Sequence, residues 1–363
     1  MQDGKQTVLI TGVSGNLGLR LLAQLSQCDV VGVDLAPPKN ANLARFQSLD
    51  LGDESACWEL MGLIRETQPN AVVHLAFVID PVRTGVLDVD RMWHINVAGT
   101  ARVMEAIAEV NRMGGQVEKF IFPSSVSAYG SHLPTMVKED YPLGGHTLPY
   151  AIHKRDSDRV VQMRAAEMFG ARTYLLRPHI YAGASVQNYL IGAFRGTPTG
   201  HGRRASRMRD KGKRLPIMLP LGEKYLQNRI QFVHVDDMAR LITHILRRQQ
   251  QDPVITILNV AGRGEPLTFK QCVQISGNRL LRVPKPFFRA FLGLLWKLGI
   301  SGIPPDAVPY MTGTYVLDTT RLREFLGSDY EEVIHHSVER AFADSFKPTV
   351  EHAVGAAEPS AAH

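Results

Sequence analysis

Tyr150 and Lys154 lie four positions apart in the segment PYAIHK, residues 149–154. If this segment is helical, both side chains lie on one face of the helix, one turn apart. A free phenol has a pKa of about 10 and is a poor base at neutral pH. A neighbouring ammonium favours the phenolate and lowers that pKa, so Tyr150 could remove or supply a hydroxyl proton. By itself, the same spacing also fits an exposed helical pair without a catalytic role.

Proton transfer of this kind accompanies hydride transfer from an alcohol carbon. That reaction needs a base for the hydroxyl proton, a hydrogen-bond donor for the developing oxyanion and a bound nicotinamide. Ser125, after the strand predicted at residues 119–122, could supply the donor; a serine and a tyrosine near a sheet edge could also be structural. The remaining requirement is a dinucleotide site, for which the N-terminal residues provide a pattern.

A glycine turn, residues 12–18 (GVSGNLG), follows a short β-branched strand predicted at residues 7–11 and precedes a leucine-rich helical pattern. Strand, glycine turn and helix together form the context expected of a dinucleotide-binding motif. Gly12 permits the tight turn, Gly15 lets a pyrophosphate approach the backbone, and Gly18 allows close helix packing. The helix N-terminus then faces the phosphates. The other turn residues expected against the cofactor are Ser14, Asn16 and Leu17.

Asp34 ends the next predicted strand, residues 30–33, and lies 22 residues after Gly12. A carboxylate at this position accepts hydrogen bonds from the ribose hydroxyls of NAD and would repel the 2′-phosphate of NADP. NAD is therefore the expected cofactor, with NADP disfavoured. The alternative is a turn aspartate at a strand end.

Strands and helices continue to alternate along the chain, which predicts a Rossmann-type, doubly wound parallel sheet covered by helices on both sides. The further strands are expected at residues 46–50, 71–76, 119–122 and 173–178, and the helices at residues 56–67, 89–110 and 150–170. The fold class is α/β, with a smaller C-terminal substrate-binding lobe.

The chain resembles the extended branch of the short-chain dehydrogenase/reductase family, of the NAD-dependent epimerase/dehydratase type. The matching stretches together are highly specific. They are residues 11–18, 50–53, 74–76, 96–100, 124–130, 150–154, 177–178 and 232–237. The match runs from about residue 7 to 240 and continues more loosely to about 330.

The resemblance implies roles for particular residues. Ser125, Tyr150 and Lys154 would be catalytic. Ser125, 25 residues before Tyr150 as in the family, would also bind the substrate oxygen, with Ser124 as the rival serine. Tyr150 and Lys154 would also contact the cofactor, Lys154 at the nicotinamide ribose. Arg229 would contact a substrate diphosphate; its alternative is a surface arginine at a strand start. Further cofactor contacts implied are Asp50 and Leu51 at the adenine, Leu75 and Ala76 at the nicotinamide-side ribose and Pro178 at the nicotinamide, with Asn96 behind the site.

Composition narrows the classes of partner. The formal charge of +6 is accounted for by residues 201–214, which hold seven Lys and Arg against one acidic residue, so a general nucleic-acid surface is not expected. The cysteines, Cys28, Cys57 and Cys272, have no metal-ligand spacing and suggest a reducing compartment, the cytoplasm. No transmembrane span, signal peptide or metal site is expected. By resemblance, the protein should be a homodimer.

The chain divides into an NAD-binding domain and a substrate lobe. Residues 1–182 form the first, to which residues 230–262 return; residues 183–229 and 263–347 form the substrate lobe, and residues 348–363 a disordered tail. The basic run at residues 201–214 is expected to be a mobile loop, either a lid or simply solvated. The helical apolar stripe at residues 286–300 is expected to pack against the substrate lobe, line its pocket or attach to a membrane surface. Asp236 and Asp237 are expected to cap a helix at residues 238–247.

Three functions remain open. The first is a nucleotide-sugar epimerase, in which Tyr150 takes a hydroxyl proton, NAD takes the hydride and the hydride returns to the opposite face of the keto sugar. The second is a simple NAD-linked dehydrogenase or reductase of an apolar alcohol or ketone, resembling 3β-hydroxysteroid dehydrogenases. Ile180 favours this second function because nucleotide-sugar epimerases often have an asparagine there. Dehydration is disfavoured because Val126 and Ser127 replace the Asp-Glu pair of sugar dehydratases. The third is a non-catalytic NAD sensor, against which the Ser-Tyr-Lys set argues.

Overall fold

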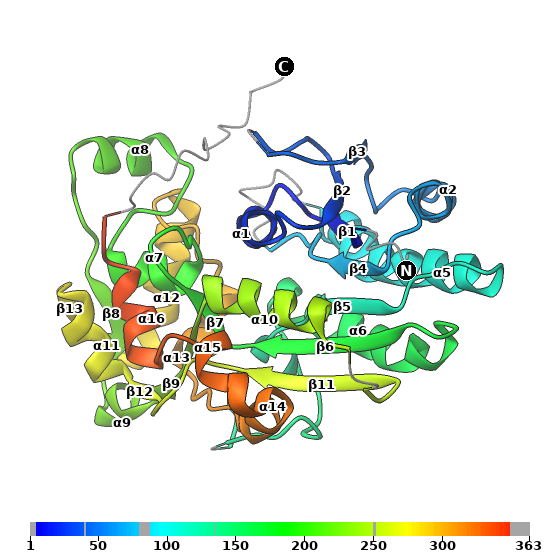
Figure 1. Ribbon diagram of the computed structural model, residues 1–363. Coiled ribbons are helices and arrows are strands. Elements are labelled where there is room, and N and C mark those ends of the chain that lie inside the picture. The colour runs from blue at the N-terminus through cyan, green and yellow to red at the C-terminus, as the bar shows by residue number, and fades with distance from the viewer. Residues whose placement is uncertain (1–4, 40, 80–87, 135, 250–251, 349–363) are drawn as a thin grey trace.

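The computed structural model describes residues 5–39, 41–79, 88–134, 136–249 and 252–348 of the 363-residue chain (Figure 1). At its centre lies a sheet of seven parallel strands in the order β11-β6-β5-β4-β1-β2-β3. The strands are β1 (Thr7–Thr11), β2 (Asp29–Asp34), β3 (Arg45–Ser48), β4 (Ala71–His74), β5 (Lys119–Pro123), β6 (Arg172–Pro178) and β11 (Ile255–Val260). The predicted α/β fold with a Rossmann-type sheet is confirmed.

Helices cover both faces of this sheet because successive side chains of each strand point to opposite sides. In β1, Val8 and Ile10 enter the core beneath α1 (Asn16–Gln24) and α10 (Val235–Arg247). Leu9 enters the other core, beneath the second group of helices. That group comprises α2 (Ala56–Thr67), α5 (Gly99–Arg112) and α6 (Pro149–Arg164). Both cores are continuous apolar layers, as expected of a parallel sheet.

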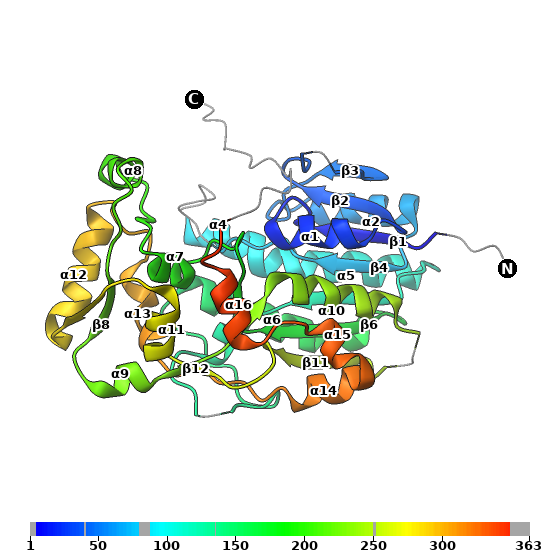
Figure 2. The same cartoon turned by 60° about the vertical axis from the view of Figure 1, so that its left-hand side comes forward.

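The substrate lobe lies beyond the carboxyl ends of the strands and has a core of its own (Figure 2). Aromatic rings pack in this core: Phe342 stacks on Phe232 with centroids 4.5 Å apart and meets Phe194 edge-on with centroids 5.1 Å apart. Three two-stranded sheets help to build it: β7 (Ile180–Ala182) with β10 (Phe232–His234), β8 (Ile217–Pro220) with β13 (Leu280–Val283), and β9 (Arg229–Ile230) with β12 (Leu267–Thr268). The helices of the lobe are α7 (Tyr189–Arg195), α8 (Arg203–Asp210), α9 (Glu223–Gln227), α11 (Phe269–Ser276), α12 (Lys285–Lys297), α13 (Val308–Thr312) and α16 (Val338–Asp344). Two further helices, α14 (Thr320–Leu326) and α15 (Tyr330–Val333), pack near α10 and β11.

The structure corrects two local predictions. The basic run contains helix α8 where a loop was expected, because Ala205 packs inward and Arg209 donates to the carbonyls of Pro198 and Gly200 at 2.6 and 2.8 Å. Helix α10 begins at Val235 and is capped by the His234 ring rather than by Asp236 or Asp237. These two aspartates lie in its first turn, where they bind Arg20 and Arg240.

The predicted helix at residues 89–110 forms, but with a π-helical turn inside it. It consists of α4 (Val89–Trp93), a π-helical segment His94–Ala98 and α5. Such insertions often occur at functional sites. Apart from Pro348, the predicted tail at residues 348–363 lies outside the described residues.

The apolar helix predicted at residues 286–300 is α12, and its expected burial is only half right. Phe288 and Leu292 are buried against the lobe, whereas Phe287, Phe291, Leu294 and Leu298 are exposed. Among the described helices, none is long and apolar enough to cross a bilayer.

Candidate active site

Helix α6 begins with Pro149 at its first turn, where the missing amide of proline costs nothing, and the predicted helical placement of Tyr150 and Lys154 is confirmed. Lys154 Nζ donates to the carbonyl oxygen of Pro123, at the end of β5, at 2.8 Å. This bond fixes one face of α6 against the carboxyl edge of the sheet. Ligands bind at that edge in open α/β sheets.

The ammonium of Lys154 is almost wholly withdrawn from water. It lies 3.6 Å from the centroid of the Phe77 ring, 5.0 Å from that of Phe122 and 6.0 Å from that of Tyr150. Burial lowers the pKa of Lys154 to about 7, with the charge of Asp158 acting in the opposite direction. The aromatic faces offset part of the lost hydration through cation–π attraction.

Tyr150 is half-buried, and its ring meets the Phe77 ring edge-on with centroids 5.9 Å apart. Burial raises the pKa of Tyr150, and hydrogen bonding with the Ser125 and Ser127 hydroxyls opposes that rise. The expectation that Lys154 lowers this pKa is wrong in this structure, because Lys154 is not among the groups that shift it. The physical reason is that the ammonium faces the Phe77 ring and the Pro123 carbonyl instead of the phenol.

Ser125 lies just after β5, at the start of a 3-10 turn, Val126–Tyr129. Its Oγ accepts from the amide of Ser127 at 3.2 Å and from the Ser127 hydroxyl at 2.9 Å. A role for Ser127 was not predicted from the sequence, although the three serines within residues 124–127 could have indicated a cluster of hydroxyls. The structure thus brings two hydroxyls to the phenol of Tyr150 where one was predicted.

Ser124, the rival serine, is buried, and its Oγ has no hydrogen-bond partner among the described residues. A buried hydroxyl without a partner is costly and usually marks a place where a ligand or water binds. Ser124 is therefore a candidate ligand contact beside Ser125.

The glycine turn has the geometry that a dinucleotide requires. At Gly12, φ is +71° and a Cβ would lie 2.5 Å from the amide nitrogen of Ala76. A Cβ on Gly18 would lie 2.5 Å from the carbonyl oxygen of Val13, so this glycine allows helix α1 to approach β1. Gly15 caps α1, and the only nearby atom that a Cβ would meet is the Gly12 carbonyl oxygen at 3.2 Å. The turn is therefore tight at both ends and open where phosphates would approach.

Asp34 lies at the end of β2 beside the glycine turn. One carboxylate oxygen accepts from the Ser14 amide at 2.9 Å and the other from the Leu35 amide at 2.8 Å. Both bonds orient the carboxylate and leave lone pairs for ribose hydroxyls. Asn16, in the same turn, donates through Nδ2 to the hydroxyl of Ser185 at 3.2 Å.

The other predicted cofactor residues also lie along the carboxyl edge of the sheet. Asp50 accepts from Arg91 at 2.5 Å and from the Gly52 amide at 2.8 Å, and Leu51 beside it is buried. The amide of Leu75 donates to the Thr11 carbonyl at 3.0 Å, which places the start of the Leu75-Ala76 segment against the glycine turn. Pro178 ends β6, paired with Val260.

Asn96, on the π-helical segment, is fully buried behind the site. Its side-chain oxygen accepts from the Val78 amide at 2.6 Å, and its side-chain nitrogen donates to the Val78 carbonyl at 3.0 Å. The same nitrogen lies 3.3 Å from Nδ1 of His153. Burial lowers the pKa of His153, so this ring is neutral at pH 7. His153 therefore acts as a structural contact between α6 and the π-helical segment.

A buried ion pair that sequence reasoning missed fixes α6 to β6. Arg177 and Asp158 form two parallel hydrogen bonds of 2.9 Å, and Arg177 also donates to the Tyr129 hydroxyl at 2.8 Å. Asp158 lies one turn beyond Lys154, so the spacing of Tyr150, Lys154 and Asp158 was its signal. The pair links β6, helix α6 and the turn that carries Ser125 and Ser127.

Arg229, the predicted substrate ligand, is exposed on β9. Its carbonyl accepts from the Tyr315 amide at 2.9 Å, and no described residue forms an ion pair with its guanidinium. The contacts of the described residues do not join its side chain to Ser125, Tyr150 or Lys154. Its role stays a prediction.

Another polar cluster lies between β10 and α16. His234 and His336 stack with ring centroids 3.9 Å apart, and Asp344 lies close by. Nδ1 of His234 accepts from the Asp236 amide at 3.2 Å, which leaves the proton of the neutral ring on Nε2. The His234 ring therefore caps α10, and the ligand atoms of His234, His336 and Asp344 lie within 4.8 Å of one another.

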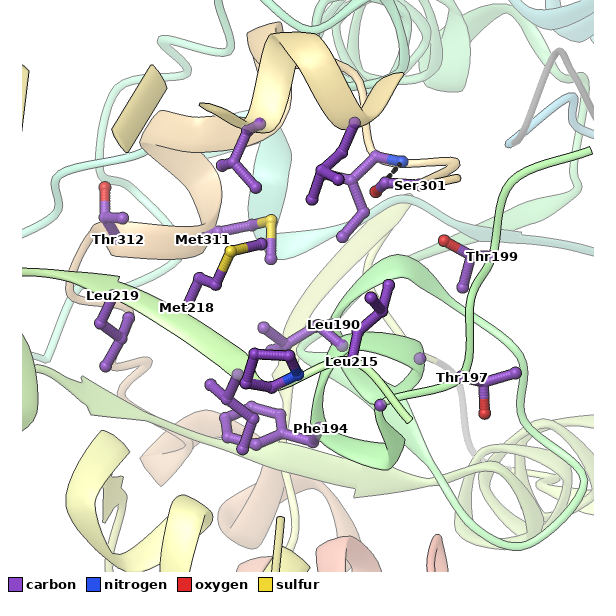
Figure 3. A pocket seen from close by; sticks show the side chains of 18 of the residues that line it. Leu190, Phe194, Thr197, Thr199, Leu215, Met218, Leu219, Ser301, Met311 and Thr312 are labelled. Carbon is purple, nitrogen blue, oxygen red and sulfur yellow. Dashed lines mark hydrogen bonds between the residues drawn. The ribbon is translucent and has the colours of Figure 1, made fainter. Parts of the chain in front are cut away.

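A cavity of about 50 Å³ lies deeper in the substrate lobe, beneath α12 (Figure 3). Its lining is predominantly apolar, with Leu190, Phe194, Met218, Leu292 and Met311 among the side chains that face it. Ala193, Ile303 and Met311 belong both to this lining and to the apolar cluster in which Tyr150 packs. The cavity thus lies next to the apolar cluster in which Tyr150 packs.

Together these residues fit a bound dinucleotide. The glycine turn leaves room for phosphates, Asp34 presents oriented lone pairs for a ribose, and the Ser124 hydroxyl and Lys154 ammonium face the same edge of the sheet. The model of the NAD dependent epimerase/dehydratase family matches residues 8–261, well over half of the chain. The chain belongs to the NAD dependent epimerase/dehydratase family. The predicted family, enzyme class and NAD cofactor are thereby confirmed at the level of the family.

Relatives within this epimerase/dehydratase family are distant. The chain is 28% identical to D-erythronate dehydrogenase of Cupriavidus necator over 162 residues, which covers 40% of this chain and 47% of that protein. It is 28% identical to UDP-glucose 4-epimerase of Erwinia amylovora over 184 residues, 47% of this chain and 52% of that protein. The chain thus matches about half the length of these relatives.

Solved structures share the fold. UDP-glucose 4-epimerase of Thermus thermophilus, in complex with NAD, superposes with a TM-score of 0.63 at 20% identity, over 95% of this chain and 100% of that one. This coverage extends the likeness from the NAD-binding sheet to the substrate lobe.

Proposed function

We propose that the protein is an NAD-dependent epimerase that acts on a hydroxyl-bearing carbon of a nucleotide sugar. The observation that carries the proposal is the position of Phe77. This residue directly follows Ala76, which packs on Gly12 of the glycine turn, and its ring contacts both Tyr150 and Lys154. The cofactor turn and the proton-transfer pair are therefore joined by a single short segment after β4.

NAD, when bound, supplies the hydride acceptor and donor at the reacting carbon. The glycine turn and Asp34 would hold its pyrophosphate and adenine-side ribose, and Lys154 its nicotinamide-side ribose. Tyr150 exchanges the proton of the substrate hydroxyl. Ser125, with Ser127 hydrogen-bonded to it, orients the substrate oxygen and stabilises charge there. The nearby rings of Phe77 and Phe122 limit access of water to this proton transfer.

The nucleotide sugar is supported by the relatives, several of which are UDP-glucose 4-epimerases. Arg229 would contact the diphosphate of such a substrate, since a guanidinium offers bidentate hydrogen bonds to phosphate oxygens. Its exposed position on β9 leaves the guanidinium accessible to a ligand.

A second candidate, an NAD-linked dehydrogenase or reductase of an apolar alcohol or ketone, is favoured by the apolar cavity. That cavity shares Ala193, Ile303 and Met311 with the cluster around Tyr150, so an apolar group bound near the phenol would find a matching surface. Ile180, at the start of β7, packs against the apolar core of the substrate lobe.

A substrate panel distinguishes the two candidates. The purified enzyme is incubated with UDP- and dTDP-sugars and catalytic NAD, and in parallel with apolar secondary alcohols and stoichiometric NAD. Interconversion of sugars without net NADH supports the epimerase. Stoichiometric NADH from an apolar alcohol, with no sugar product, rejects the epimerase and supports the dehydrogenase.

Tyr150→Phe tests the reaction class common to both candidates. The substitution removes the hydroxyl that exchanges the proton, and we expect turnover to fall by about 10²–10⁴-fold. NAD binding, followed by calorimetry, should persist because the ring contact with Phe77 remains. Tyr141→Phe, a tyrosine in the cluster of Val126 and Leu133, is the matched control. Undiminished turnover in Tyr150→Phe would refute the assignment.

We also propose that the protein works in the cytoplasm as a homodimer. The three cysteines, Cys28, Cys57 and Cys272, are free thiols, as suits a reducing compartment. Helices α5 and α6 pack side by side on one face of the sheet and could pair with the same two helices of a second copy.

A further inference from the structure

Helix α12 carries a narrow apolar stripe that faces solvent. The exposed fractions are 65% for Phe287, 40% for Phe291, 51% for Leu294 and 37% for Leu298. These residues recur at intervals of four, three and four, so they lie along one line of the helix surface. Among the exposed large apolar residues of the described chain, no other helix holds as many.

The neighbouring face of the same helix fixes it to the lobe. Phe288 and Leu292 are buried, and with Leu295 they line the apolar cavity. The exposed stripe therefore belongs to an anchored helix and keeps its orientation relative to the lobe. Lys297, near its C-terminus, is exposed beside the stripe.

Helix α8 carries the complementary feature, a cationic face. Arg203, Arg204, Arg207 and Lys211 lie on one side of it, opposite the buried Ala205. None of these four, nor Lys213 and Arg214 just beyond, forms an ion pair with a carboxylate in the described part of the chain. The positive charge that dominates the net charge of the protein is thus concentrated here and left unpaired.

The two helices are joined through their backbones. Gly200 donates to the Ile300 carbonyl at 3.0 Å and Gly202 to the Gly299 carbonyl at 3.0 Å. A Cβ on Gly200 would collide with the Gly299 oxygen, so only glycine allows this approach. In Figure 2 both helices lie at the far edge of the substrate lobe, with α8 above α12. The two helices that carry the cationic face and the apolar stripe are therefore held next to each other on one edge of the lobe.

We propose that α12 and α8 together form a docking surface for a bilayer containing anionic lipids. An amphipathic helix that lies in the interface buries its apolar side chains at the acyl boundary, and neighbouring cations bind the headgroups. The four apolar residues of α12 supply the first element and the unpaired cations of α8 the second. This surface lies on the lobe that bounds the apolar cavity, so the protein would dock with its substrate lobe toward the membrane.

Charge decides between a membrane and a second copy of the chain as the partner of this surface. Two copies meeting through α12 would bring two unpaired cationic faces together, which repel each other. An anionic bilayer attracts the cations and accepts the phenylalanine and leucine side chains at once. The proposal is independent of the substrate, because none of these residues lies in the proton-transfer site.

Vesicle flotation tests the proposal with the full-length protein. The protein is mixed with vesicles of phosphatidylcholine alone and with vesicles in which about one-third of the lipid is phosphatidylglycerol. We expect binding to the anionic vesicles, little binding to the neutral ones, and loss of binding at high salt as the charges are screened. No binding to anionic vesicles at low salt overturns the proposal without recourse to any variant.

Variants then assign the binding to the two helices. Phe291→Ser with Leu294→Ser, and separately Arg204→Glu with Arg207→Glu, should each weaken vesicle binding by about tenfold or more. The matched controls are Trp58→Ser, an exposed apolar residue on α2, and Lys270→Glu, an exposed lysine on α11, and both should bind as the wild type does. Unchanged melting temperature and NAD affinity show that each variant is folded. Vesicle binding that is unchanged in both double variants refutes the proposal. So does self-association through the stripe, seen by light scattering, if the protein does not bind vesicles.

Discussion

Lys154 is an ionisable side chain that is almost completely buried. Among the described residues, its ammonium has one hydrogen-bond acceptor, the Pro123 carbonyl, and it otherwise faces the rings of Phe77 and Phe122. Burial disfavours the charged form and lowers its pKa from 10.5 to about 7. Near neutral pH this lysine therefore exists in both protonation states. Lys154 can therefore itself exchange a proton near neutral pH.

The burial of Lys154 predicts a pH-dependent stability. Between pH 7 and pH 10 the unfolded chain keeps a proton on this lysine that the folded chain has released, so its contribution to stability rises with pH, by up to about 1.4 kcal/mol per pH unit. The difference in free energy of unfolding, wild type minus Lys154→Met, should thus increase from pH 7 to pH 9. Urea denaturation of both proteins at each pH measures it.

Taking the difference isolates Lys154, because the other groups titrate in both proteins. Lys270→Met, at an exposed lysine on α11, is the matched control. A difference between wild type and Lys154→Met that stays constant over this pH range would mean that Lys154 is charged throughout in the folded protein.

At the scale of secondary-structure elements, the position of α6 depends on the ion pair between Arg177 and Asp158. Both side chains are almost fully buried, and their two hydrogen bonds of 2.9 Å join the end of β6 to the middle of α6. The Tyr129 hydroxyl, bonded to Arg177, extends the network to the turn after β5. A change at either charged residue should therefore affect both the stability of the protein and the placement of Tyr150.

Removing one partner should cost about 3–5 kcal/mol of unfolding free energy, because the other charge is left buried and unpaired. We expect this loss for Arg177→Met and for Asp158→Asn in urea denaturation. The double variant should lose less than the sum of the two single losses, since it leaves no unpaired charge. Additive losses would contradict a direct energetic coupling between these residues.

These elements also show what a single sequence reveals and what it does not. The pair Tyr150 and Lys154 could be predicted from the spacing within one helix, and the glycine turn and Asp34 from their places along one continuous strand, turn, helix and strand. The strands of the central sheet could be predicted because they are short apolar runs between helical patterns. Arg177 and Asp158 could not be paired in advance because they lie on different elements and meet only through the sheet. Helix α8 was not predicted because a run of basic residues is typical of a solvent-exposed loop. The helix is held in place by the burial of Ala205 and by the contacts of Gly200 and Gly202 with residues 299–300.

At the scale of the whole molecule, the two helix layers of the sheet have different surroundings. The layer of α1 and α10 is partly covered by α14 and α15. In the other layer α5 and α6 lie side by side, joined by an ion pair between Glu105 and Arg164. Met163 on α6 projects from this layer with 78% of its surface exposed. A large apolar residue on a paired-helix face suits the centre of a contact between two copies.

The homodimer can be tested at Met163. Light scattering should give a molar mass of about twice the 40.3 kDa of the chain for the wild type. Met163→Asp would place an unpaired charge in the contact and should weaken dimerisation by roughly a hundredfold, or about 3 kcal/mol. Phe291→Ser on α12 is the control and should leave the dimer intact, because α12 is assigned to the membrane. A monomeric wild type would exclude the dimer, and dissociation caused by Phe291→Ser alone would move the contact between copies to α12.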